Sequence, residues 1–291
     1  MRIRGLVLVA ILLLTGSSSS ATSSTGGAAA GSAARVVDGS YKSKALAGRI
    51  GYSVYLPAGY GRSSKRYPVI YFLHGLPGTS QSYRSIGFIT RPIEKTGMAA
   101  IVVGAQGARK GDTDPEWHDW GPRRNWETAT AKELVSVIDS RYRTIPSRNA
   151  RALIGISGGG YGATLIAIHR PSVYSFIESW SGYFHATNPQ GTAPMDLGSK
   201  DANDWANAHT LVPKLKSFFK DYPYPATHYG FYVGTNDGHF FAENRQFNRE
   251  LNAAGIQHLY SEYKGTHTAS FWKEHEYDWV KAVLQVLPRP R

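Results

Sequence analysis

Short apolar runs, each bounded by turn residues, recur along the chain and predict β-strands. Continuous apolar runs cover residues 69–73, 100–103, 152–154 and 231–233, and mixed runs cover 52–56, 176–180 and 259–263. Strands that are apolar throughout are typical of a parallel sheet, because helices bury both of its faces. Between the strands, apolar residues recur at helical spacing over 130–138, 161–169, 244–253 and 272–286. This alternation predicts an α/β fold with a central, mostly parallel sheet and helices on both faces.

The first 35 residues differ in composition from the rest of the chain. Arg2 and Arg4 precede an apolar run over 6–14, and small residues continue to Ala21. This order is typical of a secretory signal peptide, and the run is shorter than the roughly 20 residues that span a bilayer. We therefore expect a signal peptide over 1–21, a flexible Ser/Gly/Ala linker over 22–35 and one catalytic domain over 36–291. The prediction is a secreted, extracellular protein with no stable membrane span.

The amino-acid composition excludes some kinds of partner and catalytic group. The formal net charge is +12, but Lys and Arg are scattered and no run of five basic residues occurs, which argues against a nucleic-acid partner. The net charge could attract an anionic cell-wall polymer or an acidic substrate, but a charge that merely keeps a secreted protein soluble is the preferred interpretation. Cysteine is absent, which excludes thiol nucleophiles and Cys-ligated metals. A nucleophile, if the chain has one, must be of another type.

A nucleophile motif follows the apolar run 152–154. Gly155, Ile156, Ser157, Gly158 and Gly159 match G-x-S-x-G, and a predicted helix begins at 161. Strand, sharp turn and helix form the context in which this motif exposes a serine above a sheet. Glycines two residues before and after the serine let strand and helix approach closely. We therefore predict that Ser157 is the nucleophile and that Gly155 and Gly159 form its turn.

Candidate partners for the serine follow two later strands. Asp237 comes after the run 231–233, and His267 comes after 259–263. Parallel strands bring the loops at their carboxyl ends to one edge, and serine, acid, histidine is the chain order of α/β-hydrolases. We predict that His267 is the base and Asp237 the acid that orients it. Glu243 and Asn236 are alternatives for the orienting residue.

The loop after the run 69–73 is the expected source of a second oxyanion donor. It reads His74, Gly75, Leu76, Pro77, Gly78 and precedes the serine motif in the chain. Backbone N–H groups of Leu76 and Gly158 are therefore the predicted donors to a tetrahedral intermediate.

These motifs together resemble the putative esterase family, which groups S-formylglutathione hydrolases, feruloyl and acetylxylan esterases, and the mycolyltransferases of mycobacterial cell walls. The resemblance runs from about residue 50 to residue 287 and includes the segments 73–75, 155–163, 234–238 and 265–272. It implies an α/β-hydrolase that acts on carboxylic esters without a cofactor. The chain departs from the pattern at Gly158, where many relatives carry methionine, and in its export signal, since formylglutathione hydrolases are typically cytosolic.

The long stretches 104–125 and 183–210 lack a regular pattern, and such stretches are often binding loops. The first contains an acidic, aromatic segment, 112–120, which could hold Ca²⁺ but lacks the glycine and terminal glutamate of an EF-hand loop. We expect no metal there. Aromatic side chains near the site could stack on a sugar or aryl group, or could instead be buried in the core. The candidate substrate contacts are His74, Trp117, Trp120, Trp126 and Trp272.

The sequence thus predicts a secreted serine esterase that works through an acyl-enzyme on Ser157. Its expected substrate is a carboxylic ester, with an acylated carbohydrate or aryl ester as candidates. An acyltransferase that passes the acyl group to a sugar hydroxyl would use the same residues. An inactive cell-wall or carbohydrate-binding protein on the same fold is the alternative of another class. The oligomeric state stays open.

Overall fold

The computed structural model describes residues 33–112, 115–185 and 211–291. The predicted signal peptide (1–21), most of the predicted linker (22–35) and most of the stretch 183–210 lie outside the described residues. The described part contains eight strands in one sheet. They are β1 (Arg35–Ser43), β2 (Gly48–Leu56), β3 (Val69–Leu73), β4 (Ile101–Ala105), β5 (Arg151–Ile156), β6 (Phe176–Trp180), β7 (His228–Gly234) and β8 (Leu259–Tyr263).

The strand order places two antiparallel pairs at one edge of the sheet and parallel pairs in the rest. It runs β1-β2-β4-β3-β5-β6-β7-β8. β1 pairs with β2, and β2 with β4, in antiparallel fashion, whereas every pair from β4 to β8 is parallel. The carboxyl ends of β5, β7 and β8 therefore meet at one edge, where the predicted site residues follow.

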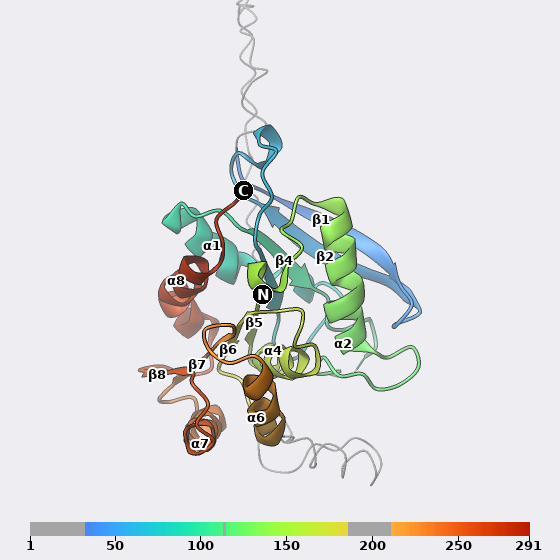
Figure 1. The fold of residues 1–291 in the computed structure, drawn as a ribbon. Helices are drawn as coiled ribbons and strands as arrows, with labels where there is room; N and C mark the ends of the chain where they lie inside the picture. The colour runs from blue at the N-terminus through green and yellow to red at the C-terminus, as the bar shows by residue number, and fades with distance from the viewer. Residues whose placement is uncertain (1–32, 113–114, 186–210) are drawn as a thin grey trace, which may run out of the picture. The chain divides into compact units, whose positions relative to one another are not determined.

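Helices bury both faces of the sheet, as the continuous apolar strands require. Along β3, Val69, Tyr71 and Leu73 face one apolar cluster, and the alternate residues Ile70 and Phe72 face the other. The first cluster includes side chains of α3, α4, α6 and α7, and the second includes those of α1 and α8. Figure 1 shows α1 and α8 together on one side of the sheet. The helices are α1 (Gly87–Thr96), α2 (Trp126–Thr128), α3 (Val135–Arg141), α4 (Gly158–His169), α6 (Leu211–Asp221), α7 (His239–Ala253) and α8 (Ala269–Val286).

The predicted fold class is confirmed, and all seven predicted strands are present. One strand and three helices, among them the three-residue α2, have no counterpart in the sequence prediction. β1 lies at the sheet edge, and its first four residues are exposed, so it lacks an apolar run. α1 contains Pro92 in its interior, a residue that normally ends a helix. α6 carries Pro213 near its start, where proline is tolerated but weakens the helical pattern.

The carboxylic acid of Glu178 lies inside the apolar core. Glu178 in β6 is fully buried, and it accepts hydrogen bonds from Trp180 Nε1 at 3.0 Å and from the Tyr232 hydroxyl at 3.1 Å. Burial raises the pKa of Glu178 to about 8, against the smaller, opposite effect of the two hydrogen bonds. The side chain is therefore largely neutral at pH 7.

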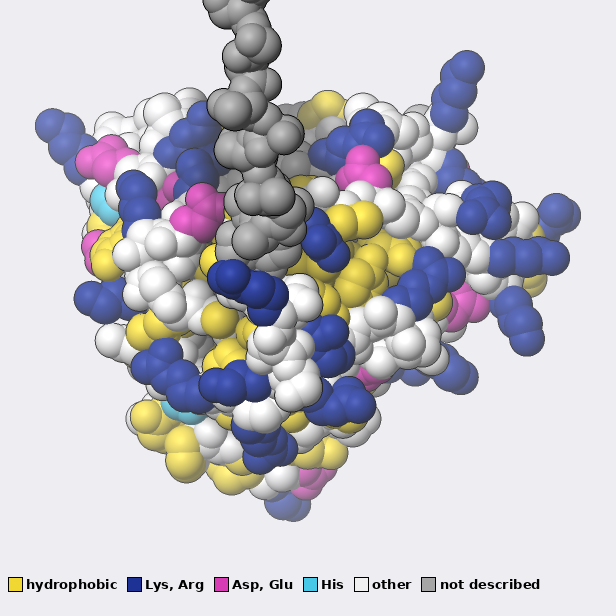
Figure 2. Space-filling model, turned by 90° about the horizontal axis from the view of Figure 1, so that it is seen from above, with side chains coloured by type: hydrophobic (Ala, Val, Ile, Leu, Met, Phe, Trp, Pro, Cys, Tyr) yellow, Lys and Arg dark blue, Asp and Glu magenta, His cyan; other side chains and the backbone are white. Residues whose placement is uncertain are grey.

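Positive charge is dispersed over one face of the molecule. On the face seen in Figure 2, Lys and Arg side chains are spread among uncharged and apolar ones. In the part of the chain that the structure describes, no helix combines the length and the apolar character needed to cross a membrane.

Candidate active site

Ser157 occupies a strained turn between β5 and α4. Its backbone has φ 56° and ψ −124°, a region that glycine adopts readily and other residues rarely. The turn is held by hydrogen bonds from Ser157 N to Trp180 O (2.8 Å) and from Gly160 N to Ser157 O (2.7 Å). This conformation places the serine side chain beyond the end of the strand.

The two flanking glycines are needed for close approach. A Cβ at Gly155 would lie 1.9 Å from the carbonyl oxygen of Gly159, and a Cβ at Gly159 would lie 2.2 Å from that of Leu73. Both obstacles are backbone atoms, which cannot rotate away. Strand β5, its neighbour β3 and helix α4 can therefore meet here only without side chains at these two positions.

The structure brings the three predicted partners into one line. His267 Nε2 lies 2.9 Å from Ser157 Oγ, and His267 Nδ1 lies 2.9 Å from Asp237 Oδ1. The second contact has the distance of an ion pair, but the imidazole N–H does not point at the oxygen within hydrogen-bonding angles. The Asp237 side chain is fully buried, whereas that of His267 is 29% exposed. Imidazole can thus accept the serine proton on one side while a water-shielded carboxylate faces its other nitrogen.

The alternative orienting residues point elsewhere. Glu243 Oε1 accepts hydrogen bonds from the backbone N–H groups of Phe184 and His185, both at 2.9 Å, and contacts the His185 ring. Asn236 is exposed to solvent. Of the three candidates, Asp237 is the one that the structure places against His267.

Two aromatic rings hold the imidazole in place. Phe240 stacks on the His267 ring with centroids 4.0 Å apart and an angle of 18°. Trp272 meets the ring edge-on at 5.0 Å, and its Nε1 donates to Ser181 Oγ at 3.1 Å. Sequence reasoning missed Phe240, although its position three residues after Asp237, in the first turn of α7, indicates where it points.

A cleft of about 660 Å³ opens at these residues. Leu76 and Gly158 both line it, and within the described residues neither backbone N–H donates a hydrogen bond. A Cβ at position 158 would lie 2.8 Å from Leu76 Cγ, so the leucine side chain packs directly against the glycine. Leu76 thus fills space that a larger residue at position 158 would use. The cleft is lined by Leu76, Pro77, Ser157, Gly158, Tyr183, Asn236, Asp237, His239, Phe240 and His267.

His74 has a structural place instead of a substrate contact. Its Nε2 accepts a hydrogen bond from Gly107 N at 3.0 Å, and its Nδ1 lies 2.8 Å from Gly75 O, so the proton belongs on Nδ1. Burial lowers the pKa of His74, which keeps Nε2 free to accept. The ring thereby ties the loop after β3 to the loop after β4. The prediction that His74 contacts the substrate is wrong, because the residue is only 4% exposed and does not line the cleft.

The four candidate tryptophans also lie outside the cleft lining. Trp117 and Trp126 are each 1% exposed, so the prediction that they contact a substrate is wrong; both belong to the core. Trp120 is half-buried and donates from Nε1 to Pro115 O at 2.6 Å. Trp272 reaches the site only through the His267 ring.

Glu116, in the acidic segment 112–120, contacts the wall of the cleft. Glu116 accepts a hydrogen bond from the Tyr183 hydroxyl at 2.5 Å, and Tyr183 lines the cleft. Glu116 and Trp117 both have positive φ, 49° and 65°, so this part of the backbone is strained. Across the described ranges, which omit 113–114, no three His, Asp or Glu side chains gather where a metal ion could bind.

Comparison with known proteins identifies the family. A family model described as putative esterase matches residues 43–275. The chain belongs to the putative esterase family. The resemblance drawn from the motifs is thereby confirmed.

Three relatives show how far the similarity reaches. An esterase of Mycobacterium tuberculosis is 29% identical over 252 residues, which cover 78% of this chain and 54% of that protein. The chain thus spans about half the length of this relative. A protein of Xylanibacter ruminicola named endo-1,4-beta-xylanase/feruloyl esterase is 31% identical over 180 residues, covering 57% of this chain and 24% of its own. A diacylglycerol acyltransferase/mycolyltransferase of Mycobacterium leprae is 27% identical over 95 residues, or 33% and 28% of the two chains.

Solved structures support the fold. A ferulic acid esterase superposes with a TM-score of 0.72 at 23% identity, covering 88% of this chain and all of that one. At this identity the likeness concerns the α/β-hydrolase fold.

Proposed function

We propose that the protein is a serine carboxylic ester hydrolase. The observation that carries the proposal is the line from Ser157 Oγ through the His267 ring to the buried Asp237, with 2.9 Å at both contacts. In this mechanism His267 takes the proton from Ser157 as the serine oxygen attacks the ester carbonyl carbon. The alcohol leaves with that proton, and an acyl-enzyme remains on Ser157. Water, deprotonated by the same imidazole, then releases the acid.

The oxyanion would form between two backbone amides. Leu76 and Gly158 both line the cleft beside Ser157, and they lie next to each other. Each donor of this kind contributes about 3 kcal/mol to the transition state. The family membership supports the assignment, because the loop and the motif occupy the positions that acyl transfer requires in this fold.

The cleft favours a neutral acyl group with apolar or aromatic surface. Its walls include Leu76, Pro77, Tyr183 and Phe240, and the described lining has no Lys or Arg that would attract an anion. An aryl ester or an acylated carbohydrate fits these walls. The names of two relatives, a feruloyl esterase and a ferulic acid esterase, point in the same direction.

Acyl transfer to a sugar hydroxyl is the second candidate. It is favoured by the similarity to the mycolyltransferase of M. leprae, and it would use the same acyl-enzyme. The two reactions differ only in whether water or a sugar hydroxyl attacks the acyl-enzyme.

We also propose that the protein is secreted, on the order of basic, apolar and small residues over 1–21. Expression of the full chain in an actively exporting bacterium tests this. Mass spectrometry of the medium should find a chain that begins after residue 21. Retention of the intact chain in the cytoplasm would refute secretion.

Hydrolysis is tested with a panel of p-nitrophenyl acyl esters, methyl ferulate and acetylated xylan, each with and without a sugar acceptor. Ser157→Ala should lose turnover on every substrate, while Ser140→Ala, which changes an exposed serine of α3, should keep it. A fluorophosphonate probe should label the wild type but not Ser157→Ala. Wild-type turnover by Ser157→Ala would refute the mechanism, and acylated sugar as the main product would favour transfer over hydrolysis.

A further inference from the structure

A second hollow lies at the opposite end of the sheet from the cleft. It has a volume of about 290 Å³, and it includes His228, the first residue of β7, and Leu259, the first residue of β8. The catalytic residues follow the other ends of these two strands. Since β7 has seven residues, at about 3.3 Å each the two sites are about 20 Å apart.

Exposed apolar side chains gather around this hollow. Among the described residues, five large hydrophobic side chains are exposed, and three of them line it: Tyr224 at 47%, Leu259 at 52% and Val286 at 42%. Single exposed apolar residues are ordinary on a protein surface, but their concentration around one concavity indicates a ligand.

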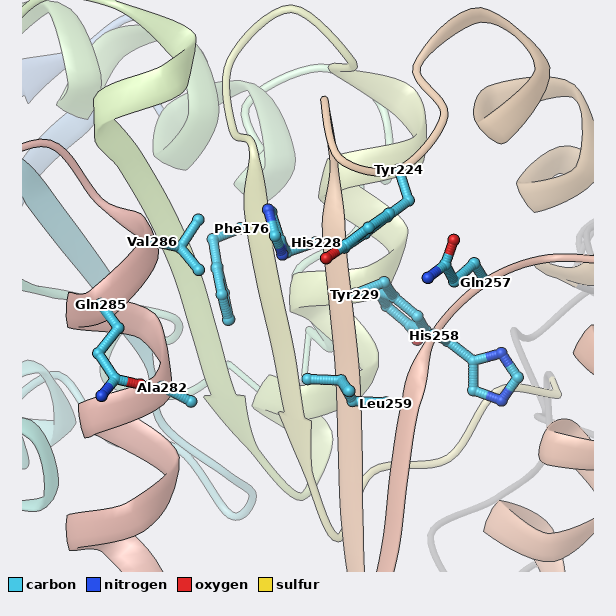
Figure 3. Close-up of a pocket in the computed structure, with 10 residues that line it drawn as sticks. All are labelled: Phe176, Tyr224, His228, Tyr229, Gln257, His258, Leu259, Ala282, Gln285 and Val286. Carbon is cyan, nitrogen blue, oxygen red and sulfur yellow. The ribbon is translucent and has the colours of Figure 1, made fainter.

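The hollow also carries hydrogen-bonding groups that no described residue uses. Gln257 and Gln285 are both exposed, and Figure 3 shows them on opposite sides of the hollow, with Gln285 projecting from α8. The Tyr224 ring meets the His228 ring edge-on at 4.9 Å. The side chains of all four residues lack hydrogen-bond partners within the described ranges. Two amides, a phenol and an imidazole therefore surround an apolar floor.

The described lining of the hollow has no charged side chain that would attract an ionic ligand. The chain has a net charge of +12, yet none of the ten residues that line the hollow is Asp, Glu, Lys or Arg. Burial lowers the pKa of both His228 and His258, so the two histidines of the lining are neutral at pH 7. A ligand for this site is therefore neutral, and it combines an apolar face with several hydroxyl groups.

We propose that this hollow is a non-catalytic binding site for a neutral sugar ring of a polysaccharide. A pyranose presents axial C–H groups on its faces, which pack on aromatic and aliphatic side chains, and hydroxyls around its rim, which bond to amides. The volume accommodates one or two rings. A polysaccharide held there would stay near the cleft at the other end of the sheet, which raises its effective concentration at that cleft. The inference does not depend on ester hydrolysis.

The test uses the full chain and unesterified xylohexaose, cellohexaose and mannohexaose, titrated by calorimetry. We expect at least one to bind with a Kd of about 0.1–1 mM, as for a small open site. Tyr224→Ala and Gln285→Ala should each weaken binding at least tenfold. Val36→Ala, which shortens an exposed apolar side chain on β1, and Ser157→Ala should bind as the wild type does. Failure of esterase activity would leave these results unchanged.

Three outcomes would overturn the proposal. The first is no binding of any of the three hexasaccharides at 10 mM. The second is wild-type affinity in both Tyr224→Ala and Gln285→Ala, with melting temperatures like that of the wild type. The third is a wild-type dimer, seen by analytical ultracentrifugation, that Tyr224→Ala converts to monomer, because the hollow would then be an interface between copies of the chain.

Discussion

The buried carboxyl of Glu178 links pH to stability. Its pKa is raised to about 8 by burial in the folded protein, against 4.5 for a solvated glutamate, as in the unfolded chain. Below about pH 4.5 both states hold the proton, and the carboxyl causes no loss of stability. Between the two values the unfolded chain releases a proton that the folded protein keeps, so the free energy of unfolding falls as pH rises. The two values differ by about 3.5, which corresponds to a loss of roughly 5 kcal/mol that is complete above pH 8.

Replacement by glutamine should remove this loss, because an amide stays neutral and can still accept from Trp180 Nε1. Urea denaturation of the wild type and Glu178→Gln from pH 5 to pH 9 measures the difference, and other titrating groups cancel in the comparison. We expect Glu178→Gln to be the more stable protein at pH 8.5 by several kcal/mol and to lose that advantage by pH 5. Glu274→Gln, the same change at an exposed position of α8, should show the same pH dependence of stability as the wild type. Stability curves of the wild type and Glu178→Gln that run parallel over this range would refute the reasoning.

Three further changes test the site. Asp237→Asn should lower kcat on p-nitrophenyl acetate by about 10⁴-fold, because the imidazole loses its orienting carboxylate. Asp278→Asn, the same change at an exposed position of α8, should retain activity. A loss below tenfold in Asp237→Asn would contradict the assignment. Gly155→Ala should lower the free energy of unfolding by at least about 3 kcal/mol, measured by urea denaturation. Gly48→Ala, whose Cβ would meet its nearest atom at 3.8 Å, should lower it by less than about 1 kcal/mol. Equal losses in the two variants would argue against the backbone clash. Phe240→Leu should reduce kcat about 5- to 10-fold, because the ring stacked on His267 is lost. Phe240→Tyr keeps an aromatic ring and should restore kcat. Unchanged kcat in Phe240→Leu would show that the stack does not position the imidazole.

The sequence predicts those parts of the fold that depend on local pattern. Continuous apolar runs mark the inner strands because both sheet faces are buried, and the glycines around Ser157 mark a turn that tolerates no side chains. The order of Ser157, Asp237 and His267 at strand ends is enough to predict that they meet, because parallel strands share an edge. β1 could not be predicted in this way, because it lies at the sheet edge, partly in solvent, and so has no continuous apolar run.

Other features depend on tertiary packing that no local pattern encodes. A tryptophan outside the predicted strands and helices looks the same in sequence whether it stacks on a ligand or fills the core, and Trp117 and Trp126 do the latter. His74 follows β3 directly in sequence, but a hydrogen bond from Gly107, 33 residues away, turns it inward. Phe240 acquires its place against the imidazole only when α7 docks beside β8. Each case requires the position of a second segment, which pattern alone does not supply.

The backbone of Ser157 has a consequence for evolution. A residue with a side chain at φ 56° and ψ −124° holds strain of order 1–3 kcal/mol, which glycine in its place would relieve. Ser157→Gly should thus yield an inert protein that is more robust than the natural one. Selection for stability alone would favour glycine at this position, so a strained serine here is what the proposed role of Ser157 as nucleophile leads us to expect.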